Sequence, residues 1–157
     1  MSLTGPIICI EDDDDDQQLV SAAMKELQVP HELLFFADGE TALEFLKSTS
    51  QKPFLILCDT NLPRMNGIEL RKRLNENEYL RKKSIPFLFV TTAASPALVQ
   101  TAYDATVQGY FKKPDTFRQL KEQLRLIITY WRECVHPNSD FWFYAKITCR
   151  RMFGMTF

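Results

Sequence analysis

The stretch LILCDTNLPRMNG, residues 55–67, decides the fold of this chain. It opens with four apolar residues, and such a run is typical of a strand buried on both faces of a parallel sheet. Asp59 follows at the carboxyl end of this strand, the edge at which open α/β sheets bind ligands. The alternative is that Asp59 caps the next helix, but Pro63 and Gly67 delay the start of that helix. The pattern therefore favours a functional role for Asp59.

The composition is that of an ordinary soluble globular protein. The chain has 157 residues, 45% hydrophobic and 25% charged, with a formal net charge of −1. This length predicts one domain with a substantial core. The absence of a basic excess predicts no nucleic-acid partner. Because no apolar run approaches the ~18 residues of a membrane span and no signal peptide opens the sequence, we expect a cytoplasmic location and no membrane partner.

The four cysteines show no spacing typical of a metal site. Cys9 and Cys58 lie in predicted buried strands, where a thiol serves as a small apolar side chain. We therefore expect free thiols in a reducing compartment.

Other apolar runs predict the remaining strands, at residues 7–10, 32–36, 86–93 and 109–111. Ser95 and Pro96 are typical of a helix N-terminus, and the last helix is expected from about Thr116 to Cys134. Residues 75–83 are expected to form a helix end and an exposed loop. Five strands alternating with five helices predict an α/β fold, a three-layer sandwich whose parallel sheet is flanked by helices.

Six consecutive acidic residues, 11–16, follow the first strand. Such a run is usually a solvated loop, but this one connects a buried strand to an amphipathic helix. Asp15 and Asp16 suit the positive N-terminal end of that helix. Glu11 and Asp12 stand at a strand's carboxyl end, as Asp59 does. Several negative charges in one crevice are costly unless a divalent cation neutralises them.

Two further groups stand at strand ends, the hydroxyl of Thr91 and the amine of Lys113. Taken singly, Lys113 is more often a solvated lysine and Thr91 a hydroxyl that caps a turn. Carboxylates and a backbone carbonyl suit Mg²⁺. An aspartate beside that ion, with a lysine and a hydroxyl to bind phosphoryl oxygens, is suited to accept a phosphoryl group.

Over residues 5–134 the chain resembles the receiver domain of two-component response regulators, in its stand-alone, CheY-like form. The matching features are the acidic pair after the first strand, the D-x-N-L-P-x-M-x-G motif from Asp59, the threonine after the fourth strand, and Lys113-Pro114. The resemblance implies a flavodoxin-like sheet with strand order 2-1-3-4-5. It also implies a bacterial phosphorelay protein that is not an enzyme in the usual sense.

The resemblance assigns the acidic residues. Asp59 would be the phosphoacceptor and Asp12 a direct Mg²⁺ ligand, with Glu11 in support. The Asn61 backbone carbonyl would be a further ligand of the ion. The additional aspartates of the acidic run leave open which of them reaches the metal.

The resemblance also assigns the remaining groups and the partners. Thr91 and Lys113 would bind the phosphoryl oxygens, with Thr92 as the alternative hydroxyl. Tyr110 would be the switch residue that reorients when Thr91 moves. The implied partners are a histidine kinase or phosphotransfer protein and a downstream protein target, and a homodimer is allowed.

Three other functions are compatible with parts of the sequence. An aspartyl-phosphate phosphohydrolase resembles D-x-D after the first strand, but here the motif follows the third strand and residue 61 is asparagine. A flavodoxin-like cofactor binder needs a phosphate loop where this chain is acidic. A degenerate receiver that binds partners without phosphorylation stays open, although the complete set of acid, hydroxyl and lysine argues against it.

Residues 135–157 are expected to be a C-terminal extension without a separate domain, too short for a DNA-binding output domain. Residues 142–150 alternate in a way that favours a strand, with a short helix as the alternative. The aromatic residues of the extension fit either a docking segment for a partner or a tail that lies on its own domain. His136 is expected to be a helix-end residue and not a metal ligand.

Overall fold

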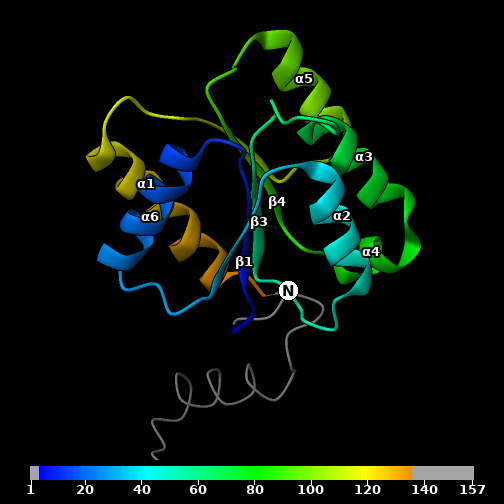
Figure 1. Ribbon diagram of the computed structural model, residues 1–157, viewed down its shortest axis with the longest axis horizontal. Coiled ribbons are helices and arrows are strands. Elements are labelled where there is room, and N and C mark those ends of the chain that lie inside the picture. Colours follow the sequence, from blue (N-terminus) through cyan, green and yellow to red (C-terminus); the bar gives the residue numbers. More distant parts are fainter. Residues whose placement is uncertain (1–3, 136–157) are drawn as a thin grey trace, which may run out of the picture.

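The core of the fold is a sheet of five parallel strands, shown in the computed structural model, which describes residues 4–135 (Figure 1). The strands are β1 (Ile7–Ile10), β2 (Leu33–Phe36), β3 (Leu55–Cys58), β4 (Phe87–Thr91) and β5 (Gly109–Lys112). Their order in the sheet is β2-β1-β3-β4-β5, and all neighbouring pairs are parallel. The predicted class and strand order are confirmed.

Helices cover both faces of the sheet (Figure 1). One face carries α1 (Asp14–Glu26) and α6 (Phe117–Glu133), which pack against each other. The other face carries α2 (Gly39–Ser48), α3 (Gly67–Glu76), α4 (Glu78–Lys83) and α5 (Pro96–Asp104). This confirms the three-layer sandwich.

The strands β1 and β3 are apolar throughout because both of their faces are covered. Successive side chains of a strand point to opposite faces. Ile8 and Ile10 therefore pack in the core beneath α2–α5, while Ile7 and Cys9 pack beneath α1 and α6. Cys9 and Cys58 are buried free thiols, as predicted.

Each helix begins at a polar side chain that accepts a hydrogen bond from a backbone N–H of the first turn. These capping residues are Asp13, Asp38, Asn66, Asn77, Ser95 and Thr116. The predicted start at Ser95 and Pro96 is confirmed. The last helix also ends where expected, with Cys134 as its C-cap.

The prediction of an exposed loop within residues 75–83 is wrong, because this segment contains the separate helix α4 (Glu78–Lys83). The Asn77 side chain accepts a hydrogen bond from the Leu80 N–H at 3.0 Å. Leu80 is buried in the core, and Ser84 ends the helix in a left-handed conformation. Residues 4–135 thus hold six helices rather than the five expected.

Hydrogen bonds between strand ends bring the candidate residues to one edge of the sheet. The Asp59 N–H donates to the Ile10 carbonyl at 2.9 Å, which aligns the ends of β3 and β1. The Lys113 N–H donates to the Thr91 carbonyl at 2.8 Å, which aligns the ends of β5 and β4. The carboxyl ends of four strands therefore meet at this edge.

Gly67 lets the loop after β3 fold back onto the strand end. Its N–H donates to the Thr60 carbonyl at 3.1 Å. A Cβ atom at this position would lie 2.3 Å from the Asp59 carbonyl oxygen and 2.7 Å from the Phe89 ring. Only glycine fits between the start of α3 and the backbone of Asp59.

Within residues 4–135, no helix has both the length and the apolar character needed to cross a bilayer. The expectations for the C-terminal extension, those for His136 and Cys149 included, lie outside the described residues.

Candidate functional site

The Asp59 carboxylate is buried and fully engaged in polar contacts. Its Oδ1 accepts hydrogen bonds from the Thr91 hydroxyl at 2.8 Å and from the Asn61 N–H at 2.9 Å. Its Oδ2 lies 2.9 Å from Lys113 Nζ. Asp59 does not cap the following helix, because Asn66 caps α3. The carboxylate therefore faces the polar groups at the sheet edge.

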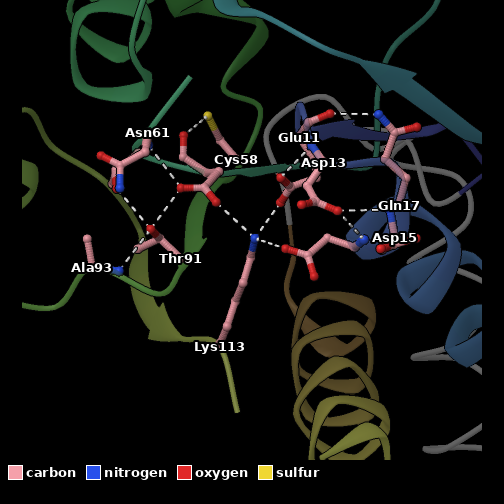
Figure 2. Close-up of polar contacts among 12 residues, drawn as sticks. Glu11, Asp13, Asp15, Gln17, Cys58, Asn61, Thr91, Ala93 and Lys113 are labelled. Carbon is pink, nitrogen blue, oxygen red and sulfur yellow. Dashed lines mark hydrogen bonds and ion pairs between the residues drawn. The ribbon is translucent and has the colours of Figure 1, made fainter. Parts of the chain in front are cut away.

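The Lys113 ammonium lies among three carboxylates (Figure 2). Besides Asp59, it contacts Glu11 and, at 2.6 Å, Asp16 Oδ2. Burial alone would lower the pKa of Lys113, but hydrogen bonds to these carboxylates outweigh burial and raise it. Lys113 is thus a protonated cation, and its ammonium group contacts carboxylates that lie far apart in the sequence.

The acidic run divides into residues with different environments. Glu11 is buried, and burial raises the pKa of its carboxyl group. Asp13 caps α1 by accepting from the Asp15 and Asp16 N–H groups, at 2.9 and 3.1 Å. Asp12 is exposed. Glu11 and Asp16 are therefore the members that contact Lys113.

The donor set suits a divalent cation in its chemistry. The carboxylates of Glu11, Asp16 and Asp59 carry a formal −3 and the Lys113 ammonium +1, which leaves −2. Hard carboxylate oxygens are the ligands that Mg²⁺ prefers. Within residues 4–135 no three His, Cys, Asp or Glu residues form a group that could hold a metal ion. The assignment of Asp12 as a ligand stays a prediction.

Thr91 is the hydroxyl that lies beside Asp59. It is fully buried, and its Oγ1 accepts from the Ala93 N–H at 3.3 Å while donating to Asp59. The Thr60 Oγ1 lies 2.9 Å from the same oxygen. Thr92 is exposed. Of the two adjacent threonines, the structure brings Thr91 to the carboxylate.

Comparison with known proteins agrees with this geometry. The family model described as the response regulator receiver domain matches residues 7–125. This chain belongs to the response regulator receiver domain family. The recognition made from the sequence is confirmed.

Curated relatives of this receiver domain include a response regulator and a chemotaxis protein. Response regulator Rcp1 of Synechocystis is 31% identical over 134 residues, which cover 82% of this chain and 90% of Rcp1. Chemotaxis protein CheY-3 of Vibrio cholerae is 39% identical over 118 residues, which cover 75% of this chain and 87% of CheY-3.

Solved structures of similar response regulators include one phosphorylated form and one metal-bound form. The phosphorylated cyanobacterial phytochrome response regulator RcpA has a TM-score of 0.78 at 27% identity, covering 86% of this chain and 99% of RcpA. The Mn²⁺-bound form of Rcp1 has a TM-score of 0.74 at 31% identity, covering 84% of this chain and 97% of Rcp1.

Tyr110 of the receiver domain lies next to the Thr91 region. Its hydroxyl donates to the Ala93 carbonyl, in the loop after β4, and its ring centroid lies 5.7 Å from that of Phe89. Burial raises the pKa of the Tyr110 phenol. The tyrosine predicted as the switch residue thus holds the loop that follows Thr91.

An ion pair anchors the receiver domain's β3–α3 loop, which carries Asn61. Arg64, in a left-handed conformation, pairs with the buried Asp38 at the start of α2. Burial alone would raise the pKa of Asp38, but hydrogen bonds from Thr41 and Arg64 outweigh the effect of burial. The pKa of Asp38 is therefore lowered from its usual value. The loop is therefore held against a second helix.

Sequence reasoning missed two residues of the site, Asp16 and Thr60. The sequence predicts only that Asp16 lies at the positive end of the helix dipole, yet its side chain contacts Lys113. A signal was available, because a cap at Asp13 places Asp16 in the first turn beside the end of β1. Nothing in the sequence marks Thr60 as part of the site, since a lone threonine after a strand is common.

Two cavities differ in their relation to the site. One, of about 310 Å³, is lined by residues that include Arg71, Asn75 and Trp131, and no carboxylate lines it. A smaller one of about 90 Å³ lies beside Lys113 and Asp16. The chemistry of the site follows from the strand ends and not from the cavity of about 310 Å³.

Proposed function

We propose that this receiver domain accepts a phosphoryl group on Asp59 and signals through protein contacts. The observation that carries the proposal is the setting of the Asp59 carboxylate, bounded by the Thr91 hydroxyl, the Asn61 N–H and the Lys113 ammonium. Such donors would stabilise the negative charge that develops during phosphoryl transfer.

In the proposed reaction an Asp59 carboxylate oxygen forms a bond to phosphorus, and the bond to the donor breaks. With a phosphohistidine donor, the leaving group is the imidazole of a histidine kinase or phosphotransfer protein. A Mg²⁺ ion, when bound, neutralises phosphoryl charge. We propose Asp12, Asp59 and the Asn61 carbonyl as its ligands, with Glu11 in support. The chemistry is that of a phosphoacceptor and not of an enzyme acting on a separate substrate.

The acyl phosphate would then change the contacts of the donors. It adds ~1.5–2 negative charges and strong hydrogen-bond acceptors. Thr91 and Lys113 would exchange Asp59 for phosphoryl oxygens, and the loop held by Tyr110 would move with Thr91. A downstream protein would read the altered surface.

The wider setting of the protein is also proposed. We propose a receiver domain spanning residues 5–134, followed by an extension over residues 135–157. A cytoplasmic location is supported by the buried free thiols of Cys9 and Cys58. Nucleic acid and membrane are not among the proposed partners, whereas a homodimer is compatible with the proposal.

The experiment is incubation with acetyl phosphate and Mg²⁺, followed by intact mass measurement. We expect a gain of one phosphoryl group that needs Mg²⁺ and is lost in Asp59→Asn. Asp104→Asn, at the end of α5, is the control for removing one surface carboxylate and should be labelled normally. Labelling that persists in Asp59→Asn overturns the assignment of Asp59. No labelling of any protein would favour a phosphorylation-independent receiver.

A further inference from the structure

Thr60 is a buried polar residue for which the proposed reaction has no role. It follows Asp59 directly and is 4% exposed. Its carbonyl accepts from the Gly67 N–H at 3.1 Å, which fixes its backbone in the turn after β3. Its hydroxyl oxygen lies 2.9 Å from that of Thr91. The two hydroxyls thus meet across the ends of neighbouring strands.

The direction of the hydrogen bond between the two threonines can be assigned. A hydroxyl group has a single proton to donate. The Thr91 proton is directed to Asp59 Oδ1, because an ionised carboxylate can only accept. In the contact with Thr91, Thr60 must therefore be the donor. The Thr91 oxygen accepts from Thr60 and from the Ala93 N–H while donating its own proton to Asp59.

We infer that Thr60 is a positioning residue, whose hydroxyl holds Thr91 in the rotamer that directs its proton at Asp59. This role rests on the proposed function in so far as it concerns phosphoryl transfer. In this role Thr60 contacts neither the phosphodonor nor the transferred phosphoryl group, and it acts only through Thr91. With its oxygen held by two donors, Thr91 has its proton already oriented toward the acceptor when a phosphoryl group arrives.

Contact with Tyr110 extends the same arrangement. Burial raises the pKa of the Tyr110 phenol, and the Thr60 hydroxyl lies near this phenol. Thr60 is thus next to both residues that are expected to move on phosphorylation. A displacement of Thr91 removes the acceptor of the Thr60 proton, so the Thr60 hydroxyl must find another partner in the same buried space.

The test compares Thr60→Val with Thr60→Ser, alone and combined with Thr91→Val. Valine keeps the branched shape and removes the hydroxyl, whereas serine keeps the hydroxyl and removes the methyl group. The first readout is the Thr91 side-chain rotamer, measured by three-bond NMR couplings without any phosphodonor. The second is the rate of labelling by acetyl phosphate with saturating Mg²⁺.

We expect a fixed Thr91 rotamer in the wild type and in Thr60→Ser, and averaged couplings in Thr60→Val. Labelling of Thr60→Val should slow about twofold to tenfold, the range expected for the net loss of one hydrogen bond. Thr60→Val should add no further slowing in the Thr91→Val background, since Thr60 acts through that hydroxyl.

The inference is overturned if Thr60→Val leaves the Thr91 couplings unchanged. It is also overturned if Thr60→Ser behaves like Thr60→Val, which would make the methyl group and its packing responsible. The NMR readout separates this inference from the proposed function. If the couplings average in Thr60→Val while the wild type accepts no phosphoryl group, the positioning of Thr91 stands and the proposed function fails.

Discussion

Lys113 Nζ lies 2.6 Å from Asp16 Oδ2 and 2.9 Å from Asp59 Oδ2. The amine proposed to bind the phosphoryl group is therefore shared with a carboxylate of α1. Asp16 adds a negative charge at the place where an anionic donor must arrive. It also gives Lys113 an alternative partner that a phosphoryl oxygen has to replace.

Replacement of Asp16 by Asn should therefore speed labelling by acetyl phosphate. One unit charge a few ångströms away in solvated surroundings is worth about 1 kcal/mol, which corresponds to roughly a fivefold faster rate. The measurement is the initial labelling rate at subsaturating donor, low salt and saturating Mg²⁺. Asp14→Asn removes the same charge from an exposed residue of the same helical turn and serves as the control. Equal rates for the two variants would show that the contact with Lys113 is irrelevant.

Divalent cation should stabilise the folded protein. At ten times its dissociation constant, a ligand that binds only the folded state adds about 1.4 kcal/mol. For a chain of this size, that raises the melting temperature by about 3–6 °C. The measurement is thermal unfolding in MgCl₂ and in EDTA.

The same measurement on two variants identifies the carboxylate that binds Mg²⁺ together with Asp59. If Asp12 holds the ion, Asp12→Asn abolishes the Mg²⁺-induced rise and Asp16→Asn retains most of it. The opposite pattern would transfer the role to Asp16, whose side chain already faces Lys113. Asp14→Asn is the control for loss of a charge and should keep the rise.

Substitution of Gly67 by Ala should destabilise the domain by about 1–3 kcal/mol, the usual cost of forcing extra atoms into a packed site. The added methyl group would collide with the Asp59 carbonyl oxygen and the Phe89 ring. Urea unfolding measures the loss. Glu76→Ala, an exposed position at the end of the same helix, is the control and should change stability little. Equal stability of both variants would mean that the loop moves away without cost.

His31 should make stability depend on pH. Burial lowers its pKa from the usual ~6.5. Its Nδ1 lies 2.7 Å from the Gly5 carbonyl and must donate, which leaves the buried Nε2 unprotonated and without a partner. Protonation of Nε2 would thus bury an unpaired charge.

The sign of the pH effect follows from that lowered pKa. Between the folded and unfolded pKa values, the unfolded chain binds more protons. The contribution of His31 to stability is therefore complete above pH ~6.5 and declines as the pH falls toward the folded pKa. His31→Phe should lose less stability than the wild type between pH 7.5 and pH 5. His136→Gln, the control at the other histidine, should follow the wild type, and an unchanged slope in His31→Phe would contradict the prediction.

Sequence reasoning went furthest where one local pattern has one structural meaning. Short apolar runs bounded by turn residues predict strands buried on both faces, and this pattern predicted β1, β3 and β4. Asp59, Thr91 and Lys113 could be grouped because the carboxyl ends of parallel strands meet at one edge. In the structure the side chains of Thr91 and Lys113 both contact the Asp59 carboxylate.

Other features depend on contacts that local patterns do not reveal. The Asn77 cap creates α4 in a charged segment whose only buried residue is Leu80, so its pattern resembles that of a loop. The partner of Asp16 lies 97 residues away, and Thr60 meets Thr91 across two strands. Such pairings follow from the sheet register and side-chain direction, which sequence periodicity does not determine.

The contact between Glu11 and Lys113 joins residues 102 positions apart in the chain. A nascent polypeptide that has emerged from the ribosome only as far as β4 already carries Asp59 and Thr91, yet it has no amine at the sheet edge. Domains fold as units during synthesis. Competence to receive a signal should therefore arise in a single step, when β5 joins the sheet. A partner that recognises the assembled edge would therefore bind only chains in which β5 has joined the sheet, and it would not bind nascent chains that lack β5.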